Sequence, residues 1–598
     1  MTDILSRRDV QFMLNEWLDV SRLAGRDRFA GQTVDDWADV LELAEQVASE
    51  QFAPHNRKAD ANEPEIGEDG RVVLIPEVAE AMGVLGETGL MAAAMPEKVG
   101  GMGLPMTISS AIFAWLHGAN VSTAAYAMLT AGAANLLLAN GSEEQIETWV
   151  EPMVAGRFFG TMCLSETQAG SSLSDITTKA VPQDDGTYRV FGNKMWISAG
   201  DHELSENIVH LVLAKIPGGP AGVKGISLFI VPRFLLDEDG GPGERNDVVL
   251  AGINHKMGFR GTVNTVLGFG EGEHRPGGEA GAVGYLIGEP HRGLAYMFHM
   301  MNEARIGVGL GATALGYTGY LKSLRYARER PQGRPLASKD PADPQIPISE
   351  HSDVKRMLLA QKSYVEGALG LDLYCSTLVD DEATAPTEEE RNRAALLLEI
   401  LTPIAKSWPS QWCLEANSLA IQVHGGYGYA REYDVEQHYR DNRLNPIHEG
   451  THGIQALDLL GRKVTMHGGA AFGALYETIG ETIAEARAAG GEAAELAGSL
   501  EAALARLAEV TGILWADRNP ELALANATVY LEAAGHVVIA WIWLEQFLAA
   551  AGKDGDFYDG KRQAARFFYR FELPKTAPQL DLLAGLDRTT LEMEDDWF

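Results

Sequence analysis

The chain has 598 residues, with 49 Lys or Arg against 83 Asp or Glu, so its formal net charge is −34. So acidic a surface repels phosphate backbones, which excludes nucleic acid as the expected partner. The 46% of apolar and 22% of charged residues are typical of a globular protein, and the length allows several domains. Three cysteines are too few for a disulfide framework, and the first thirty residues lack the apolar run of a signal peptide. We therefore expect a cytoplasmic protein.

The hydrophobic period changes twice along the chain. Helical spacing dominates residues 35–158, where Trp37, Val40, Leu41 and Val47 are among the apolar positions. From residue 159, short β-branched and aromatic runs alternate with Gly, Pro, Asp and Asn, which predicts a compact β domain ending near residue 288. Long helical patterns then return at about 292–330, 349–380, 388–420 and 433–463, with a Pro- and Asp-rich loop at 331–347. Long helices with short links favour an antiparallel bundle.

The fold class that follows is α+β, with an N-terminal helical domain, a central β-barrel domain, a C-terminal four-helix bundle and an extra C-terminal helical domain. The tail after residue 463 is rich in Ala and Glu and reads as helical, with a net charge of −11. The predicted boundaries are 1–34 for an N-terminal helical extension, 35–158 for the helical domain, 159–288 for the β domain, 289–463 for the bundle and 464–598 for the C-terminal helical extension.

Two stretches are apolar enough to raise the question of a membrane, residues 124–140 and 537–551. Gly and Asn interrupt the first, Glu545 and Gln546 interrupt the second, and neither has eighteen clean apolar residues. The second could instead lie on a membrane surface, but it lacks the basic polar face of such helices. We expect two buried helices and no integral membrane insertion.

Residues 448–452 read HEGTH, which matches the H-E-x-x-H pattern of zinc peptidases. On a helix this spacing places two imidazoles one turn apart, with the glutamate as general base. Pro446 and Gly450 favour instead a turn that leads into a helix from about Ile454, in which the two histidines need not share a face. A zinc peptidase is therefore the alternative from a different class of function, and no metal is expected.

Two glycine-rich segments resemble nucleotide-binding loops. Residues 309–314 (GLGATA) mimic a dinucleotide fingerprint, but they lie inside a helical pattern rather than after a strand, so we expect close helix packing there. Residues 425–430 (GGYGYA) end a helix and either cap it or present backbone N–H groups to a phosphate.

Five strings in order over residues 35–463 resemble the acyl-CoA dehydrogenase flavoprotein family. They are 164–171 (LSETQAGS), 194–198 (KMWIS), 326–334 (YARERPQGR), 422–428 (QVHGGYG), and 449–451 (EGT) followed by Ile454 and Gln455. The length and the tail resemble a large bacterial branch that includes 3-methylthiopropionyl-CoA dehydrogenases and long fatty acyl-CoA dehydrogenases. The resemblance implies an FAD cofactor shared between subunits, and hence an oligomer, with a homodimer favoured.

The family's binding residues map onto this chain position by position. The resemblance puts Leu164 and Ser165 on the flavin pyrimidine edge, Trp196 beside the ring and Ser198 near N5. It puts Arg330, Gln422 and Gly426 on the adenosine diphosphate part of a neighbouring subunit's FAD, and Thr451 on the pyrophosphate. It places Ser171 near the CoA phosphates and Arg305 on the CoA side.

The resemblance implies dehydrogenation of a fatty acyl-CoA to a trans-2-enoyl-CoA. Glu449 would remove the α-proton, helped by a pKa that an apolar pocket raises, and flavin N5 would take the β-hydride. The thioester oxygen would accept hydrogen bonds from the Glu449 N–H and the flavin ribityl 2′-hydroxyl. The expected electron acceptor is an electron-transferring flavoprotein, in fatty acid β-oxidation. Alternatives within the fold are a 3-methylthiopropionyl-CoA dehydrogenase and an acyl-CoA oxidase.

The chain departs from the family pattern at several positions. His448 stands where an aromatic residue usually precedes the base, so an imidazole lining the pocket would alter substrate choice or pH response. Thr167 replaces a Pro, Ser172 replaces an Asp, and Gly453 replaces an amide side chain at a flavin contact. Residues 330–334 lack the Phe usually found between the Gln and the Gly.

Overall fold

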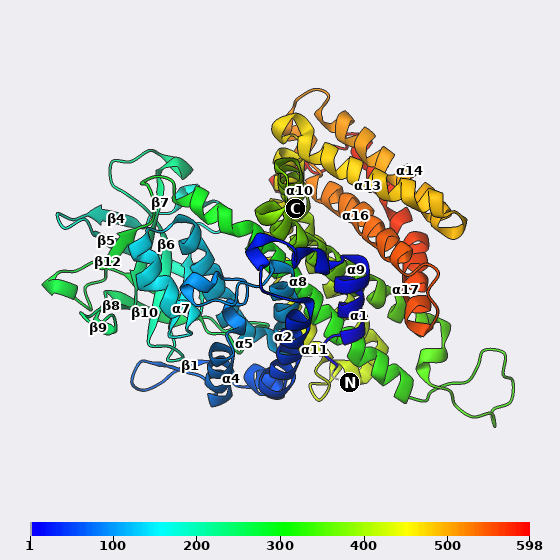
Figure 1. Ribbon diagram of the computed structural model, residues 1–598, viewed down its shortest axis with the longest axis horizontal. Helices are drawn as coiled ribbons and strands as arrows, with labels where there is room; N and C mark the ends of the chain where they lie inside the picture. The colour runs from blue at the N-terminus through cyan, green and yellow to red at the C-terminus, as the bar shows by residue number, and fades with distance from the viewer. Residues whose placement is uncertain (1–2) are drawn as a thin grey trace. The chain divides into compact units, whose positions relative to one another are not determined.

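The computed structural model describes residues 3–598, the side chains of residues 298–302 excepted. The chain divides into two compact units: one comprises the segment up to Val34 together with Arg305–Phe598, and the other is Asp35–Ala304. The first therefore joins both ends of the chain, while the second contains an N-terminal group of helices and the strands. Figure 1 shows the elements coloured along the chain.

The unit Asp35–Ala304 begins with helices that surround one long apolar helix. The helices are α2 (Val34–Val47), α3 (Asn56–Ala61), α4 (Pro76–Glu87), α5 (Met106–Asn140), α6 (Glu143–Gln145) and α7 (Glu151–Val154). A small hairpin of β1 (Glu65–Ile66) and β2 (Val72–Val73), which the helical pattern did not predict, interrupts them. α5 has apolar residues on all sides and most of it is buried, as expected of a helix in a protein core.

The β domain of this unit is a closed barrel, as the sequence predicts. The strands of the domain are β3 (Phe158–Cys163), β4 (Lys179–Pro182), β5 (Tyr188–Ser198), β6 (Asn207–Lys215), β7 (Ile226–Pro232), β8 (Phe234–Leu236), β9 (Pro242–Arg245), β10 (Val248–Ile253), β11 (Asn264–Phe269) and β12 (Ala282–Leu286). Of these, β8 and β9 form a separate two-stranded sheet. The ring runs β5–β12–β7–β6–β4 and back to β5, while β3 extends it from β6 and β11 with β10 from β5. Buried side chains of facing strands, such as Val190, Val212 and Phe229, form its core.

The unit with both chain ends contains the helix bundle. Its long helices are α8 (Gly293–Glu329, which enters from the other unit), α9 (Ser352–Thr384) and α10 (Glu388–His424), close to the predicted spans. The fourth predicted pattern, 433–463, is not one helix: α11 (Val435–Asn442) and α12 (His452–Asp458) are separated by a turn. Pro446 and Gly450 lie in that turn, and both residues interrupt helices.

Glycines on α8 let it pack closely against α10. A Cβ added at Gly309 would lie 2.0 Å from the carbonyl oxygen of Ala405, and one at Gly316 would lie 2.7 Å from Cβ of Cys413. The packing interpretation of residues 309–314 is thus confirmed, since these residues are in mid-helix and follow no strand.

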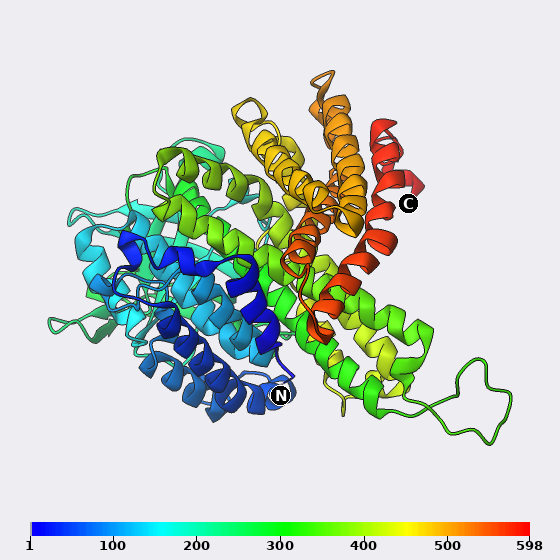
Figure 2. The same cartoon turned by 45° about the vertical axis from the view of Figure 1, so that its right-hand side comes forward.

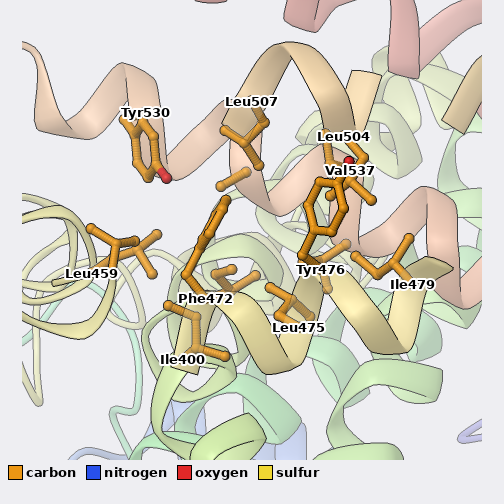
Figure 3. Close-up of a pocket in the computed structure, with 14 residues that line it drawn as sticks. Ile400, Leu459, Phe472, Leu475, Tyr476, Ile479, Leu504, Leu507, Tyr530 and Val537 are labelled. Carbon is orange, nitrogen blue, oxygen red and sulfur yellow. The ribbon is translucent and has the colours of Figure 1, made fainter. Parts of the chain in front are cut away.

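The C-terminal extension is helical, as predicted. Its helices are α13 (Ala470–Ala489), α14 (Gly491–Trp515), α15 (Pro520–Leu524), α16 (Ala527–Ala549), α17 (Asp556–Phe567) and α18 (Thr576–Ala584). Figures 1 and 2 both show α13, α14 and α16 side by side. Together with α10 they form what we call the apolar seam, where Phe472 and Tyr476 extend from α13 toward Leu504 and Leu507 of α14 (Figure 3). The remaining cavity has about 10 Å³, roughly the space of one water molecule.

The first helix of the chain, α1 (Arg7–Gln11), is fastened to the extension by buried charges. Lys561 of α17 forms ion pairs with Asp9 and, at 2.9 Å, with Glu366 of α9. The Tyr317 hydroxyl donates to Asp9 Oδ2 at 2.8 Å. This cluster explains why residues distant in sequence belong to one unit.

Two described helices, α5 and α16, are long and apolar enough to cross a membrane by length and composition. Their most apolar windows are 67% and 83% buried inside the protein. Because most of each window is buried, the prediction that both apolar stretches form buried helices is confirmed.

Candidate active site

Glu449 lies in the turn between α11 and α12, which we call the base turn (residues 445–451). Its φ is 51° and that of Gly450 is 88°, so both residues are in the left-handed region. For a glutamate this conformation costs about 1 kcal/mol or more, and it persists only where neighbouring groups hold it. The base turn is therefore a strained segment with support from outside.

Side chains on both sides support the base turn. Gln455 Nε2 donates to the carbonyl oxygen of Glu449 at 3.0 Å. The Thr451 hydroxyl caps α12 by accepting from the Ile454 N–H at 3.3 Å. From α10, Lys406 Nζ donates to two carbonyl oxygens of the turn, those of Asn445 and Gly450, each at 2.7 Å. Lys406 was not a candidate from the sequence, because nothing in its local pattern indicates partners 39 and 44 residues away.

The electrostatic surroundings of Glu449 favour a basic carboxylate. Its burial raises its pKa, while the cations Lys406 and Arg305 oppose that rise. Arg305, predicted from the family pattern, is 4% exposed, and its Nη1 donates to Asp458 Oδ2 of α12 at 2.7 Å. A carboxylate with a raised pKa accepts a proton more readily than an ordinary glutamate, and the nearby cations keep its ionised form available.

His448 is held by a row of asparagines rather than by a metal-like arrangement. Its Nε2 lies 2.9 Å from Asn445 Oδ1, and Asn445 Nδ2 donates in turn to Asn442 Oδ1 at 2.9 Å. Burial, with the charge of Lys406, lowers the pKa of His448 to about 3. His448 precedes α12 and His452 is its first residue, so the pair lacks the one-turn spacing of a zinc helix. Among the described residues, no group of three His, Cys, Asp or Glu side chains is arranged to hold a metal ion.

In the other unit, a buried ion pair joins the two predicted flavin loops. Lys194 Nζ lies 3.0 Å from Glu166 Oε1, and both side chains are at most 2% exposed. Burial raises the pKa of Glu166, but Lys194 and hydrogen bonds from Thr178 and Thr177 outweigh this and lower it to about 2. Lys194 also donates to the Leu164 carbonyl at 3.0 Å, and the Met195 N–H donates to the Ser165 carbonyl at 3.0 Å. Leu164 and Ser165 are thereby fixed beside β5.

The second loop presents its residues through an irregularity of β5. Trp196 has φ 63° and is 59% exposed, at a place where the register between β5 and β11 shifts. A bulge of this kind redirects a side chain out of the sheet. Two residues later, the Ser198 hydroxyl accepts from Asn264 Nδ2 at 3.1 Å. Ser171 lies farther along the first loop and is exposed.

The predicted adenosine diphosphate residues gather where α8 and α10 end. The ring of Tyr326 on α8 stacks on His424 of α10, with centroids 4.3 Å apart. Arg330 follows α8, while Gln422 and Gly426 are exposed at the end of α10. A Cβ at Gly426 would meet nothing within 4 Å, so this turn is open. A cation at the end of α8 and an open glycine turn at the end of α10 suit an anionic ligand.

The residues present therefore fit FAD, each group within its own unit. The exposed Trp196 ring and the hydroxyls near it suit a flat heteroaromatic ring, and the end of α10 suits phosphates. A barrel with such loops, followed by a bundle that carries a basic carboxylate in a strained turn, defines a class of flavin-dependent oxidoreductase.

The comparisons with known proteins give the family. Residues 35–157, 161–269 and 291–464 match the descriptions "Acyl-CoA dehydrogenase, N-terminal domain", "Acyl-CoA dehydrogenase, middle domain" and "Acyl-CoA dehydrogenase, C-terminal domain". Residues 475–594 match "Acetyl-CoA dehydrogenase C-terminal like". The chain belongs to the acyl-CoA dehydrogenase family, and it is an oxidoreductase with FAD as its cofactor.

Relatives match over nearly the whole chain. The chain is 37% identical to the 3-methylmercaptopropionyl-CoA dehydrogenase of Ruegeria pomeroyi, over 94% of each chain. It is 34% identical to the broad-specificity linear acyl-CoA dehydrogenase FadE5 of Mycobacterium tuberculosis, over 99% of each chain. Among solved structures, an acyl-CoA dehydrogenase complexed with FAD from Bacillus anthracis has the same fold, with a TM-score of 0.73, 20% identity and coverage of 95% of this chain and 90% of that one.

Proposed function

We propose that this protein oxidises a fatty acyl-CoA thioester to its trans-2-enoyl-CoA, with Glu449 as the base that removes the α-proton. The observation that carries the proposal is the base turn, where a half-buried carboxylate of raised pKa is held in a left-handed conformation by Gln455 and Lys406. Such a carboxylate is better matched to a weakly acidic carbon than an exposed glutamate.

The chain's own residues bind and orient the reactants. The backbone N–H of Glu449 donates to the thioester oxygen as negative charge develops there. When bound, FAD supplies the acceptor for the hydride that leaves the β-carbon. Its ring is assigned to Leu164, Ser165, Trp196 and Ser198, and its adenosine diphosphate part to Arg330, Gln422, Gly426 and Thr451. CoA is assigned to Ser171 and Arg305, whose pair with Asp458 fixes its guanidinium.

The substrate range is a separate part of the proposal. The Ruegeria pomeroyi relative makes 3-methylthiopropionyl-CoA the alternative substrate. A series of saturated acyl-CoA thioesters of increasing length, with 3-methylthiopropionyl-CoA alongside, ranks the candidates by kcat/KM. We expect linear fatty acyl-CoA thioesters to be preferred. A higher kcat/KM for the thioether substrate would replace that assignment.

The proposed setting is a cytoplasmic homodimer in fatty acid β-oxidation that passes electrons to an electron-transferring flavoprotein. Oxygen consumption in place of that transfer would instead identify an acyl-CoA oxidase. Both outcomes are measured with the same reduced protein, since the readout is the rate at which the flavin absorbance returns.

The central test is Glu449→Gln, which keeps the shape of the side chain and removes its basicity. The variant is expected to bind FAD with the yellow absorbance of the wild type, yet to lose bleaching by acyl-CoA by at least about 1,000-fold. The exposed Glu432 provides the matched control, because Glu432→Gln makes the same change in the same unit. Retained turnover of Glu449→Gln with an artificial electron acceptor would refute the base assignment.

A further inference from the structure

Lys406 is unusual among the buried lysines of this protein. The described residues contain four lysines buried below a tenth of their surface, Lys194, Lys406, Lys463 and Lys561. Lysine is almost never fully buried unless it is paired with an opposite charge. Three of the four obey this rule, since they form ion pairs with Glu166, Glu399 and Glu366 respectively.

Lys406 has no such partner among the described residues. Its side chain is 0% exposed, and its ammonium group donates to two backbone carbonyls, those of Asn445 and Gly450. These two residues bracket Glu449 within the base turn. Each bond is 2.7 Å long, as expected for a charged donor, and a carbonyl offers such a donor only part of the compensation that a carboxylate gives. The negative charge that acts on Lys406 is that of Glu449.

We propose that Lys406 is a positioning residue for Glu449: it clamps both sides of the base turn and supplies a buried positive charge beside the carboxylate. The inference rests on the proposed function, because it assigns a role toward the base of that reaction. The clamp fixes the backbone of a strained glutamate, so the carboxylate meets the α-carbon in one orientation. The charge favours the ionised carboxylate, which is the form that accepts a proton.

Of the described titratable groups around the base turn, only two are cations that act on Glu449 near neutral pH. Burial and Lys406 lower the pKa of His448 to about 3, and burial, Lys406 and Arg443 lower that of His452 to about 4, so both are neutral near pH 7. Burial lowers the pKa of Lys406 itself to about 7, against the raising effect of Glu449 and with the lowering effect of Arg305. The positive charges that act on Glu449 are thus Lys406 and Arg305, and Arg305 is committed to Asp458.

The test is Lys406→Met, which keeps the length and removes the donor and the charge. We expect kcat to fall roughly 10- to 100-fold with KM within about threefold, since positioning acts on the transition state rather than on binding. Loss of the cation raises the pKa of Glu449, so the acid limb of the kcat/KM profile moves to higher pH by about one unit. Base-catalysed exchange of the substrate α-proton in D2O, which needs no electron acceptor, slows in parallel.

Lys463→Met is the matched control. Lys463 is also buried in the same unit, but it pairs with Glu399 and has no bond to the base turn. The control is expected to leave the acid limb in place. FAD content and the unfolding temperature show that each variant is folded. If Lys406→Met does not fold, Lys406→Gln decides, because it keeps a donor without the charge and the same upward shift is expected.

The outcomes separate the two proposals. If none of the acyl-CoA thioesters bleaches the flavin of the wild-type protein, the proposed function is refuted, whatever the Lys406 variants do. An active wild type whose Lys406→Met or Lys406→Gln variant keeps the same acid limb and α-proton exchange rate overturns the role of Lys406 alone. A limb that shifts equally in Lys463→Met also overturns it, because the effect would then follow from any loss of buried charge.

Discussion

One helix, α10, serves two regions that are stabilised in opposite ways. Ile400 and Ile404 contribute to the apolar seam, where aliphatic and aromatic side chains leave a cavity of about 10 Å³. Lys406, two residues farther along, contributes to the base turn, where directional bonds from buried polar groups hold a strained backbone. Burial of area has no preferred direction, whereas a hydrogen bond fixes a distance and an angle.

This difference separates stability from chemistry along the same helix. A substitution that changes side-chain volume in the seam alters the free energy of unfolding, but it removes none of the hydrogen bonds that hold the base turn. Changes in the base turn alter few buried contacts but displace Glu449. Leu459 and Val464, which follow α12, also line the seam, so the extension packs against the segment that follows Glu449.

The largest effect on stability is expected in the seam. Leu507→Ala removes a side chain that is 2% exposed, so the free energy of unfolding falls by about 2–5 kcal/mol. Activity at a temperature where the variant is folded should stay within about twofold, since no polar contact of the base turn changes. Urea unfolding followed by tryptophan fluorescence measures the free energy of unfolding, and flavin bleaching by acyl-CoA measures the activity. Leu582→Ala, at a leucine that is 42% exposed, is the control and should change little.

A substitution in the base turn is expected to lower activity more than it lowers the free energy of unfolding. A Cβ at Gly450, where φ is +88°, would lie 2.5 Å from Nε2 of Gln455, the donor to the Glu449 carbonyl. Gly450→Ala should therefore lower kcat/KM by roughly 30-fold, about 2 kcal/mol, with a smaller change in unfolding free energy.

Gly473 of α13 supplies the comparison for that variant. A Cβ there meets nothing within 4 Å, and the residue is helical, so Gly473→Ala should be neutral or stabilising by up to about 1 kcal/mol. Equal losses of activity in the two variants would contradict the assignment of a special role to the base turn.

The smallest expected effect concerns pH. His448 has its pKa lowered to about 3 from an ordinary 6.5, so below pH 6.5 the unfolded chain binds a proton that the folded chain does not. The contribution of His448 to the free energy of unfolding is therefore fully present above pH 6.5 and is lost as the pH falls toward 3. His448→Phe should make this loss smaller, as seen by thermal unfolding from pH 5 to 8. An unchanged slope would contradict the lowered pKa, because His448 would then bind its proton equally well in the folded and unfolded chains.

Much of the fold could be predicted, because it depends on local patterns. The strand runs between residues 159 and 288 alternate with turn residues, and the structure closes them into a barrel. The apolar runs in α5 and α16 are continuous enough to indicate core helices. The prediction of one helix over 433–463 was wrong. Apolar periodicity continues on both sides of Pro446 and Gly450, but the backbone forms a turn at these residues.

The candidate site was predicted only in part. The strings around Leu164, Trp196, Gln422 and Glu449 are contiguous, so their resemblance to a flavoprotein family is visible in sequence. The groups that support them are not: Glu166 and Lys194 pair over 28 residues, and Lys406 reaches across 39 and 44 residues to the base turn. Contacts of that separation leave no local pattern.

By itself, the acidic sequence determined the class of fold, the absence of a disulfide framework and the family resemblance that makes Glu449 the proposed base, since composition, period and motif are properties of short segments. Only the tertiary structure decided that residues up to Val34 join the C-terminal unit, through Asp9 and Lys561. It also decided that Lys406, which has no carboxylate partner in the described part of the chain, donates to both sides of the base turn. The physical reason is that burial and hydrogen bonding act between segments that folding brings together, and the charge and strain at Glu449 arise from those neighbours.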